Sequence, residues 1–277
     1  GIERSQNEGL AHTPVYLTLD ARLQQILRQA LVPQIEKFEA IGGGGIVLDA
    51  RNGEVLALVS LPDFDPNVAG KISAGAEFNR VTHGVYELGS VFKIFNHAMV
   101  LETGTASLAD SYDATKPLRV GRDTISDFHP ENRWLTVPEI FMHSSNIGAA
   151  QMALAAGPEA QQKFLSRLGL MHPSPIELPR LELGKPKYPV RWPPSTTMTV
   201  AFGHGISVSL LHLSTAVAAV VNGGVMYPPT LIKRRADTSV PGTRVLSAKV
   251  SDQMRRLMRL AVEHGTGKTA NVPGYLV

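Results

Sequence analysis

Cysteine is absent from the 277 residues of this chain. Its absence excludes disulfide bonds, thiolate metal sites, iron–sulfur clusters and a cysteine nucleophile. It leaves the cellular compartment open, because a chain without cysteine folds equally well in reducing and oxidising surroundings.

The sequence also lacks a long apolar run. Its most apolar stretch, Leu210–Val221, spans 12 residues and contains His212, whereas a membrane helix needs about 20 apolar residues. The polar residues 1–9 lack the apolar centre of a signal peptide, and the chain does not begin with methionine. We therefore expect residues 1–14 to be a linker from a preceding region, and any membrane anchor to lie outside this chain.

The sequence also lacks a large excess of charge of either sign. The 27 basic and 24 acidic residues give a net charge of +3, and the basic excess is scattered along the chain. This distribution argues against a nucleic-acid partner, although a pI of 9.2 suits a protein that works beside anionic surfaces. With 43% apolar and 18% charged residues, the composition is that of a folded globular protein and excludes disorder.

The hydrophobic pattern predicts an α+β fold. Asp20 is a suitable N-cap for a helical stripe over residues 21–38, which we expect Pro33 to kink and the glycine run 42–45 to end. Strands at 46–49 and 54–59 flank a turn with Asn52-Gly53 and are apolar on both faces, which predicts helices on each side of the sheet. Further helices are expected at 90–102, 137–156 with a break at 144–146, 210–221 and 250–263. A long polar segment with few periodic features spans 105–130, and a loop is expected at 173–194.

A serine and a lysine one helical turn apart form the first candidate site, in Gly89-Ser90-Val91-Phe92-Lys93. This spacing places the Ser90 hydroxyl and the Lys93 amine on the same face of a helix. If burial and the positive end of the helix lower the pKa of Lys93, its neutral amine could take the serine proton. The alternative is a helix cap followed by a solvated lysine, which is common in proteins.

The second candidate is Ser144-Ser145-Asn146. A hydroxyl and an amide two residues apart could point into one cleft, where Ser144 relays a proton and Asn146 holds a substrate amide. The alternative is a helix break whose polar side chains satisfy backbone groups. Ser5-Gln6-Asn7 has the same pattern in the polar N-terminal segment, so the triplet alone decides nothing.

Together, and in this order, the two motifs resemble the S-x-x-K and S-x-N motifs of penicillin-recognising enzymes. The surrounding sequence extends the likeness. Leu48–Ala57 resembles the opening strands of that fold, and Phe128-His129-Pro130 resembles the approach to the second motif. From about Val15 to its end, the chain resembles the transpeptidase domain of class B penicillin-binding proteins, most closely the cell-division (septal) type. Other similar segments are Tyr86-Glu87-Leu88-Gly89, Leu135-Thr136-Val137, Phe202–Val208 and Asn222-Gly223-Gly224.

The resemblance implies a specific architecture and chemistry. An antiparallel sheet covered by helices would face a helical subdomain, with the active site between them. Ser90 would be the nucleophile that forms the acyl-enzyme and Lys93 its base, with Ser144 and Asn146 as the second motif. The backbone N–H of Ser90 would form half of an oxyanion hole. No metal or organic cofactor is implied.

The implied activity is serine-type D-Ala-D-Ala transpeptidation. The substrates would be peptidoglycan stem peptides, and β-lactam antibiotics would acylate the same serine. A glycosyltransferase and other division proteins are the implied partners. The implied location is the periplasmic face of the bacterial inner membrane.

The family's third motif, K-T-G or K-S-G, is absent from this sequence. Lys268-Thr269-Ala270 imitates it but ends in alanine, and it follows a helix instead of forming a strand. We therefore expect residues 15–277 to be a transpeptidase domain that stops before the third motif and the closing strands. A smaller departure is Leu88, where the family usually has proline.

Two other interpretations remain open, and a third is disfavoured by the sequence. The same fold serves β-lactamases and β-lactam sensors. A hydrolase would need a base for the deacylating water, and no acidic residue of the sequence is identified by its pattern as that base. The chain could also be a non-catalytic scaffold of the division machinery, an interpretation that the missing third motif favours. Gly267-Lys268-Thr269 invites a nucleotide-binding interpretation, but the phosphate loop needs a glycine where Val262 stands.

Overall fold

The computed structural model describes residues 14–65, 67–68, 75–234 and 240–277. The predicted linker therefore lies outside the described residues, except for its last residue. Strands and helices occur in separate runs along the chain, and all strand pairs of the described residues are antiparallel, which agrees with the predicted α+β class. The helices are α1 (Ala21–Lys37), α2 (Lys93–Glu102), α3 (Val137–Met142), α4 (Asn146–Ala156), α5 (Pro158–Arg167), α6 (Pro194–Val200), α7 (Leu210–Val221) and α8 (Ala248–Glu263), with 3₁₀ turns η1 (Gly89–Phe92), η2 (Arg180–Glu182) and η3 (Lys268–Ala270). The strands are β1 (Gly43–Leu48), β2 (Val55–Leu61), β3 (Ser111–Asp113), β4 (Leu118–Val120), β5 (Asp123–Ile125), β6 (Trp134–Thr136), β7 (Val225–Met226) and β8 (Thr243–Arg244).

Strands β1 and β2 form the predicted antiparallel hairpin, with Gly43 opposite Leu61 and Ile46 opposite Leu58. Its turn contains Gly53 at φ +80°, a conformation that only glycine adopts without strain. A β-carbon at Gly53 would also lie 2.5 Å from the carbonyl oxygen of Pro228. Glycine is therefore required here both by the turn and by the chain that passes behind it.

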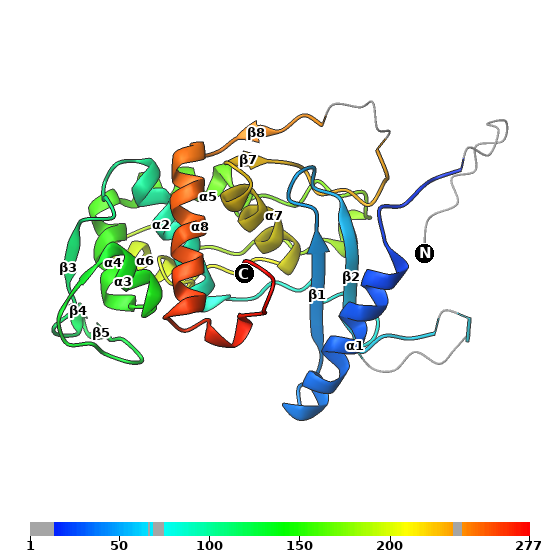
Figure 1. Cartoon of the computed structure of the whole chain (residues 1–277), viewed down its shortest axis with the longest axis horizontal. Coiled ribbons are helices and arrows are strands. Elements are labelled where there is room, and N and C mark those ends of the chain that lie inside the picture. The colour runs from blue at the N-terminus through cyan, green and yellow to red at the C-terminus, as the bar shows by residue number, and fades with distance from the viewer. Residues whose placement is uncertain (1–13, 66, 69–74, 235–239) are drawn as a thin grey trace.

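Helices lie against both faces of this hairpin, as the sequence predicts (Figure 1). A β-carbon at Gly45 would lie 2.8 Å from the side chain of Leu27 on α1, whereas one at Gly44 would lie 3.2 Å from Leu210 on α7. Since successive residues of a strand point to opposite faces, the small residues of β1 let one helix approach on each side.

The structure confirms the first predicted helix and corrects the role of the glycine run that follows it. Helix α1 continues through Pro33 to Lys37, and the glycines from Gly43 onward belong to β1. Proline removes the hydrogen bond to the carbonyl of Gln29, four residues earlier. None of the residues of α1 is fully buried, so water can bond the released carbonyl and the helix persists.

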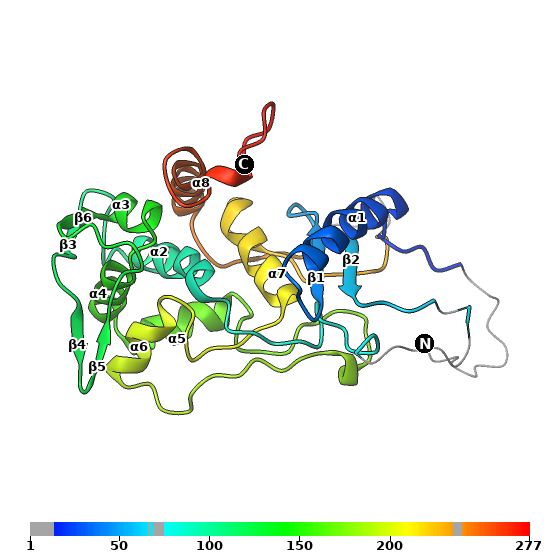
Figure 2. The ribbon, with the colours of Figure 1, turned by 90° about the horizontal axis from the view of Figure 1, so that it is seen from below.

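The remaining helices gather around α2, on the other side of α7 from the hairpin (Figure 2). Helix α2 packs against α3, α4, α5, α7 and α8. Seven of its ten residues are buried, including Lys93 at its first position and Phe95 and Met99 in the core. The N-terminus of α2 is thus held from several sides, and its first side chain is removed from water.

Two helices and several strands were not predicted. Helix α5 follows α4 after Gly157, where φ is +84°, and α6 begins at Pro194 at the end of the proline-rich segment. The polar segment 105–130, to which the sequence assigned no element, contains β3, β4 and β5, each of three residues. Strands this short carry too few residues to show an alternating pattern.

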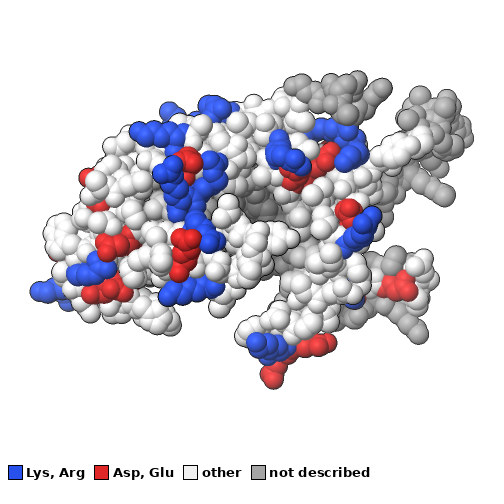
Figure 3. Space-filling view, viewed as in Figure 1, with Lys and Arg blue, Asp and Glu red and all other residues white. Residues whose placement is uncertain are grey.

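Basic side chains gather over α8 on the face shown in Figure 3. They are paired within the helix: Arg255 and Arg256 both bind Asp252, and Arg259 binds Glu263 at 2.8 Å. The basic excess on this helix is therefore interleaved with acidic partners. Among the residues that the structure describes, no helix is both long and apolar enough to span a membrane.

The hairpin turn gives a test of the fold. Gly53→Ala adds backbone strain and a contact with the Pro228 carbonyl, whereas Gly104→Ala, at φ +70° with open space around it, adds strain alone. We expect Gly104→Ala to cost about 1 kcal/mol and Gly53→Ala clearly more, measured by urea denaturation. Equal losses would show that the hairpin does not need this close approach.

Candidate active site

Ser90 and Lys93 lie where the chain enters α2. Ser90 sits in the 3₁₀ turn η1 and is exposed, while Lys93 is only 2% exposed. The Lys93 Nζ atom donates a hydrogen bond to Ser90 Oγ over 3.1 Å. The two side chains of the predicted pair thus face each other. The Ser90 hydroxyl is open to solvent, and the Lys93 amine lies behind it.

The second motif forms the junction between α3 and α4, next to the same amine. Lys93 Nζ lies 2.9 Å from Ser144 Oγ, 2.7 Å from Asn146 Oδ1 and 2.5 Å from the carbonyl oxygen of Ser144. Ser144 adopts φ +57°, which is unfavourable for a residue with a β-carbon. The structure therefore brings Ser90, Lys93, Ser144 and Asn146 together, although the two motifs are separated by about 50 residues.

The Lys93 amine has four acceptors within hydrogen-bond distance but at most three protons. In the protonated state one acceptor must therefore go without a hydrogen bond from it. A neutral amine has two protons and a lone pair, and the hydroxyl of Ser90 or Ser144 can turn to donate to that lone pair. The arrangement thus accommodates the neutral amine as readily as the charged one.

The protonation of Lys93 is shifted toward the neutral form. Burial lowers its pKa from 10.5 to about 8, and the negative charge of Asp127 acts in the opposite direction. Since each pKa unit is tenfold in equilibrium, about one-tenth of Lys93 is neutral at pH 7. The effect of burial matches the expectation from the sequence, and the carboxylate was not expected.

Asp127 is the residue that the sequence analysis missed. Its carboxylate accepts hydrogen bonds from Ser145 Oγ at 2.8 Å and from the backbone N–H groups of Asn146 at 2.6 Å and Ile147 at 3.0 Å. It therefore caps α4 from a distant part of the chain. The segment around it shows no helical periodicity, and no local pattern links it to a helix that begins 19 residues later.

The segment 202–208 packs against the turn that precedes Ser90. A β-carbon at Gly203, where φ is +82°, would lie 2.2 Å from the carbonyl oxygen of Gly89. The Glu87 carboxylate accepts a hydrogen bond from the backbone N–H of Gly205 at 3.0 Å and lies 3.3 Å from His204 Nδ1. The two segments that sequence resemblance singled out separately are thus in direct backbone contact.

A comparison with protein families gives a match over residues 43–277 to the model described as the penicillin-binding protein transpeptidase domain. The chain belongs to this family. It is 39% identical over 267 residues to a probable peptidoglycan D,D-transpeptidase, FtsI, of Caulobacter vibrioides, and 31% identical over 262 residues to the probable peptidoglycan D,D-transpeptidase PenA of Neisseria meningitidis. These matches cover 95% and 94% of the chain but only 45% and 44% of the two relatives. The chain thus spans less than half the length of these relatives.

Solved structures agree with this family and its fold. The apo transpeptidase domain of penicillin-binding protein 3 from Burkholderia pseudomallei superposes with a TM-score of 0.85 at 28% identity, covering 97% of this chain and 76% of that one. A peptidoglycan glycosyltransferase structure from Burkholderia ambifaria gives the same TM-score and identity, covering 94% of this chain and 79% of that one. The predicted fold class is therefore confirmed.

The segment that imitates the third transpeptidase motif does not form a strand. Lys268-Thr269-Ala270 forms the exposed turn η3 directly after α8. A penicillin-binding third motif is expected on a strand, and a phosphate loop should follow one. Neither role suits a 3₁₀ turn that follows a helix.

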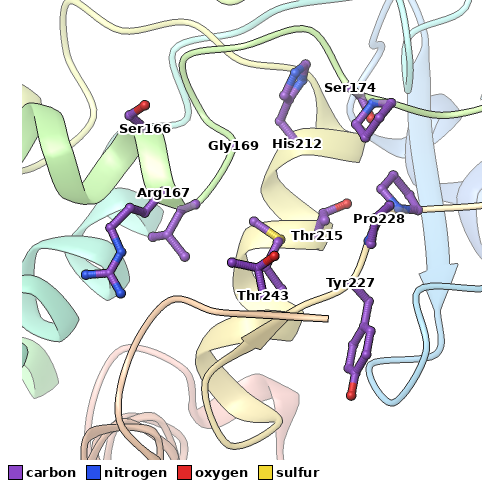
Figure 4. Close-up of a pocket in the computed structure, with 13 residues that line it drawn as sticks. Ser166, Arg167, Gly169, Ser174, His212, Thr215, Tyr227, Pro228 and Thr243 are labelled. Carbon is purple, nitrogen blue, oxygen red and sulfur yellow. The ribbon is translucent and has the colours of Figure 1, made fainter. Parts of the chain in front are cut away.

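A surface cavity of about 170 Å³ lies between α5, α7 and β7 (Figure 4). Its histidine, His212, has both ring nitrogens engaged, with Ser209 Oγ at 2.6 Å and the carbonyl of His172 at 2.8 Å. The lining includes none of the four predicted site residues of the transpeptidase. Within the described ranges of the chain, no group of three or more potential ligands is placed to hold a metal ion.

His97 lies one turn behind Lys93 and gives a pH-dependent prediction. Burial lowers its pKa from 6.5 to about 4, outweighing the hydrogen bond between its Nδ1 and the Lys93 carbonyl. Between these pH values the unfolded chain binds a proton that the folded chain does not, so stability falls as the pH falls from about 6.5 to 4. The slope from this residue is at most about 1.4 kcal/mol per pH unit.

We expect His97→Asn to remove this part of the acid destabilisation in urea denaturation at a series of pH values. His129→Asn, at an exposed position, is the matched control and should leave the slope unchanged. The same slope in all three proteins would contradict the assignment.

Proposed function

We propose that this chain is the catalytic domain of a peptidoglycan D,D-transpeptidase that cross-links stem peptides during septal cell-wall synthesis. The observation that carries the proposal is the position of Lys93 Nζ, within 3.1 Å of Ser90 Oγ and 2.9 Å of Ser144 Oγ, with a pKa lowered to about 8. A nucleophile, a base and a second hydroxyl thus share one solvent-facing site. The two relatives above, both described as probable transpeptidases, support the same assignment.

In the proposed reaction, Ser90 Oγ attacks the carbonyl carbon of the penultimate D-Ala of a stem peptide while neutral Lys93 takes the hydroxyl proton. The peptide C–N bond then breaks, and the departing D-Ala nitrogen receives a proton through Ser144. The amine of a neighbouring strand attacks the resulting ester and releases Ser90 with its proton restored. The Ser90 N–H would contribute one donor to the oxyanion, an interaction worth about 3 kcal/mol.

β-Lactams mimic the D-Ala-D-Ala end and would acylate Ser90 in the same way. The proposed domain extends from about Val15 to Val277, and the packing of α1 against β1 and β2 supports including the helix that precedes residue 43. A location at the periplasmic face of the inner membrane, and a glycosyltransferase and other division proteins as partners, complete the proposal.

The alternative of a β-lactamase has less support from the geometry. A hydrolase needs a base that activates the deacylating water. The carboxylate that acts on Lys93, Asp127, already accepts three hydrogen bonds from Ser145, Asn146 and Ile147. These hydrogen bonds commit the carboxylate to capping α4. Without a base for the deacylating water, the penicillin acyl-enzyme is expected to last for minutes to hours, as in a transpeptidase.

The nucleophile can be tested with a fluorescent penicillin on the full-length protein. Wild type should become covalently labelled, and Ser90→Ala should not, because the variant lacks the attacking oxygen. Ser107→Ala, at an exposed serine, is the control and should label normally. Persistent label on Ser90→Ala would overturn the proposal.

The base can be tested by changing Lys93 to arginine. A guanidinium stays protonated at accessible pH, so Lys93→Arg should slow acylation by about 100-fold or more, as severely as Lys93→Ala. Lys163→Arg, on the exposed face of α5, should acylate at the wild-type rate. An arginine variant with near-normal acylation, in protein shown to be folded by circular dichroism, would remove Lys93 from this role.

A further inference from the structure

We propose that Asp127 is a positioning residue for the transpeptidase reaction: its carboxylate fixes the start of α4 so that Ser144 and Asn146 face the Lys93 amine. This inference rests on the proposed function of the site. In the part of the chain that the structure describes, no hydrogen bond joins Asp127 to Ser90 or Lys93 directly, so any effect on them passes through the α3–α4 junction or through its charge.

The contacts of Asp127 are concentrated on three consecutive residues. One carboxylate oxygen accepts the N–H groups of Asn146 and Ile147, and the other accepts Ser145 Oγ. Ser145 Oγ in turn accepts the N–H of Gly148 at 3.0 Å. Three N–H groups of the first turn, which have no partner within the helix, are thus bonded by a connected pair of side chains.

This anchoring determines where the second motif points. The Asn146 side chain donates through Nδ2 to the carbonyl of Ser126 at 3.0 Å, which turns its Oδ1 toward Lys93 Nζ at 2.7 Å. Ser126 is the neighbour of Asp127, so one segment orients both the backbone and the amide of Asn146. The backbone N–H and the side-chain amide of Asn146 are therefore both held by residues 126–127.

The left-handed conformation of Ser144 supports the same conclusion. A non-glycine residue at φ +57° costs about 1–3 kcal/mol and persists only where its surroundings hold it. Its carbonyl and hydroxyl both face Lys93 Nζ. The next three residues along the chain are bonded by Asp127, and the fourth, Gly148, is bonded by Ser145. Releasing this anchor would allow Ser144 to relax away from the amine.

The charge of Asp127 has a separate effect on the base. It opposes the lowering of the Lys93 pKa by burial. The neighbouring His97 is neutral above about pH 5, because burial lowers its pKa to about 4. Removing the negative charge should therefore lower the Lys93 pKa further. The pH at which acylation begins to rise should move downward.

The experiment measures the rate of acylation by a fluorescent penicillin as a function of pH in the full-length protein. Asp127→Asn keeps the shape and loses the charge, so the acidic limb of the profile should move to lower pH. Asp127→Glu keeps the charge and displaces the carboxylate, so the limb should stay in place while the rate falls. Asp127→Ala loses both functions and should acylate about 100-fold more slowly, and Asp123→Asn, at an exposed position in β5, is the unchanged control.

A wild-type rate and pH profile in Asp127→Asn and Asp127→Ala would overturn the inference. A lowered melting temperature with normal acylation of the folded variants would do so as well, because it would reduce Asp127 to a helix cap. These outcomes differ from failure of the proposed function, in which wild type itself would not label or Ser90→Ala would label equally.

Discussion

The site depends on one buried amine. Lys93 is held at the first turn of α2, behind an exposed serine, in a position where water cannot solvate its charge and four oxygen acceptors surround it. Burial lowers the pKa of the amine to about 8, and the negative charge of Asp127 opposes this lowering. The balance leaves a fraction of the amine neutral near neutral pH, which is what a serine without a histidine partner requires.

The packing of the helical part follows from this requirement. A lysine can be buried at the start of a helix only if that helix is itself surrounded, and α2 is enclosed by five other helices. The α3–α4 junction then supplies the polar atoms, at the cost of an unfavourable backbone conformation at Ser144. Local strain and a buried charge, both unfavourable for stability, thus coincide at the place where chemistry is expected.

The sequence predicted those elements whose pattern is local. The hairpin turn at Asn52-Gly53, the buried helix 210–221 and the amphipathic helix ending at Glu263 each lie where periodicity and capping place them. The first helix lies where it was predicted, and Pro33 does not interrupt it because the carbonyl that proline releases in a surface helix can reach water. The glycines from Gly43 onward, which were expected to end this helix, belong to strand β1. The strands of segment 105–130 were missed because three residues show no alternation.

The site was predictable only in part. Ser90 and Lys93 are one helical turn apart, so their proximity follows from the sequence, whereas their approach to Ser144 and Asn146 was expected only from resemblance to a family. Asp127 could be found from neither source, since its role as a cap arises from tertiary contact between a short strand's end and a helix that begins far along the chain. A residue that acts by positioning other residues cannot be recognised from the local pattern of a single sequence.

The contact between Gly203 and Gly89 couples two segments that lie far apart in the sequence. With no space for a methyl group between these two backbones, any shift of the loop after α6 is passed on to the turn that carries the serine. A substitution in that loop can thus move Ser90 without changing any side chain that lies beside it.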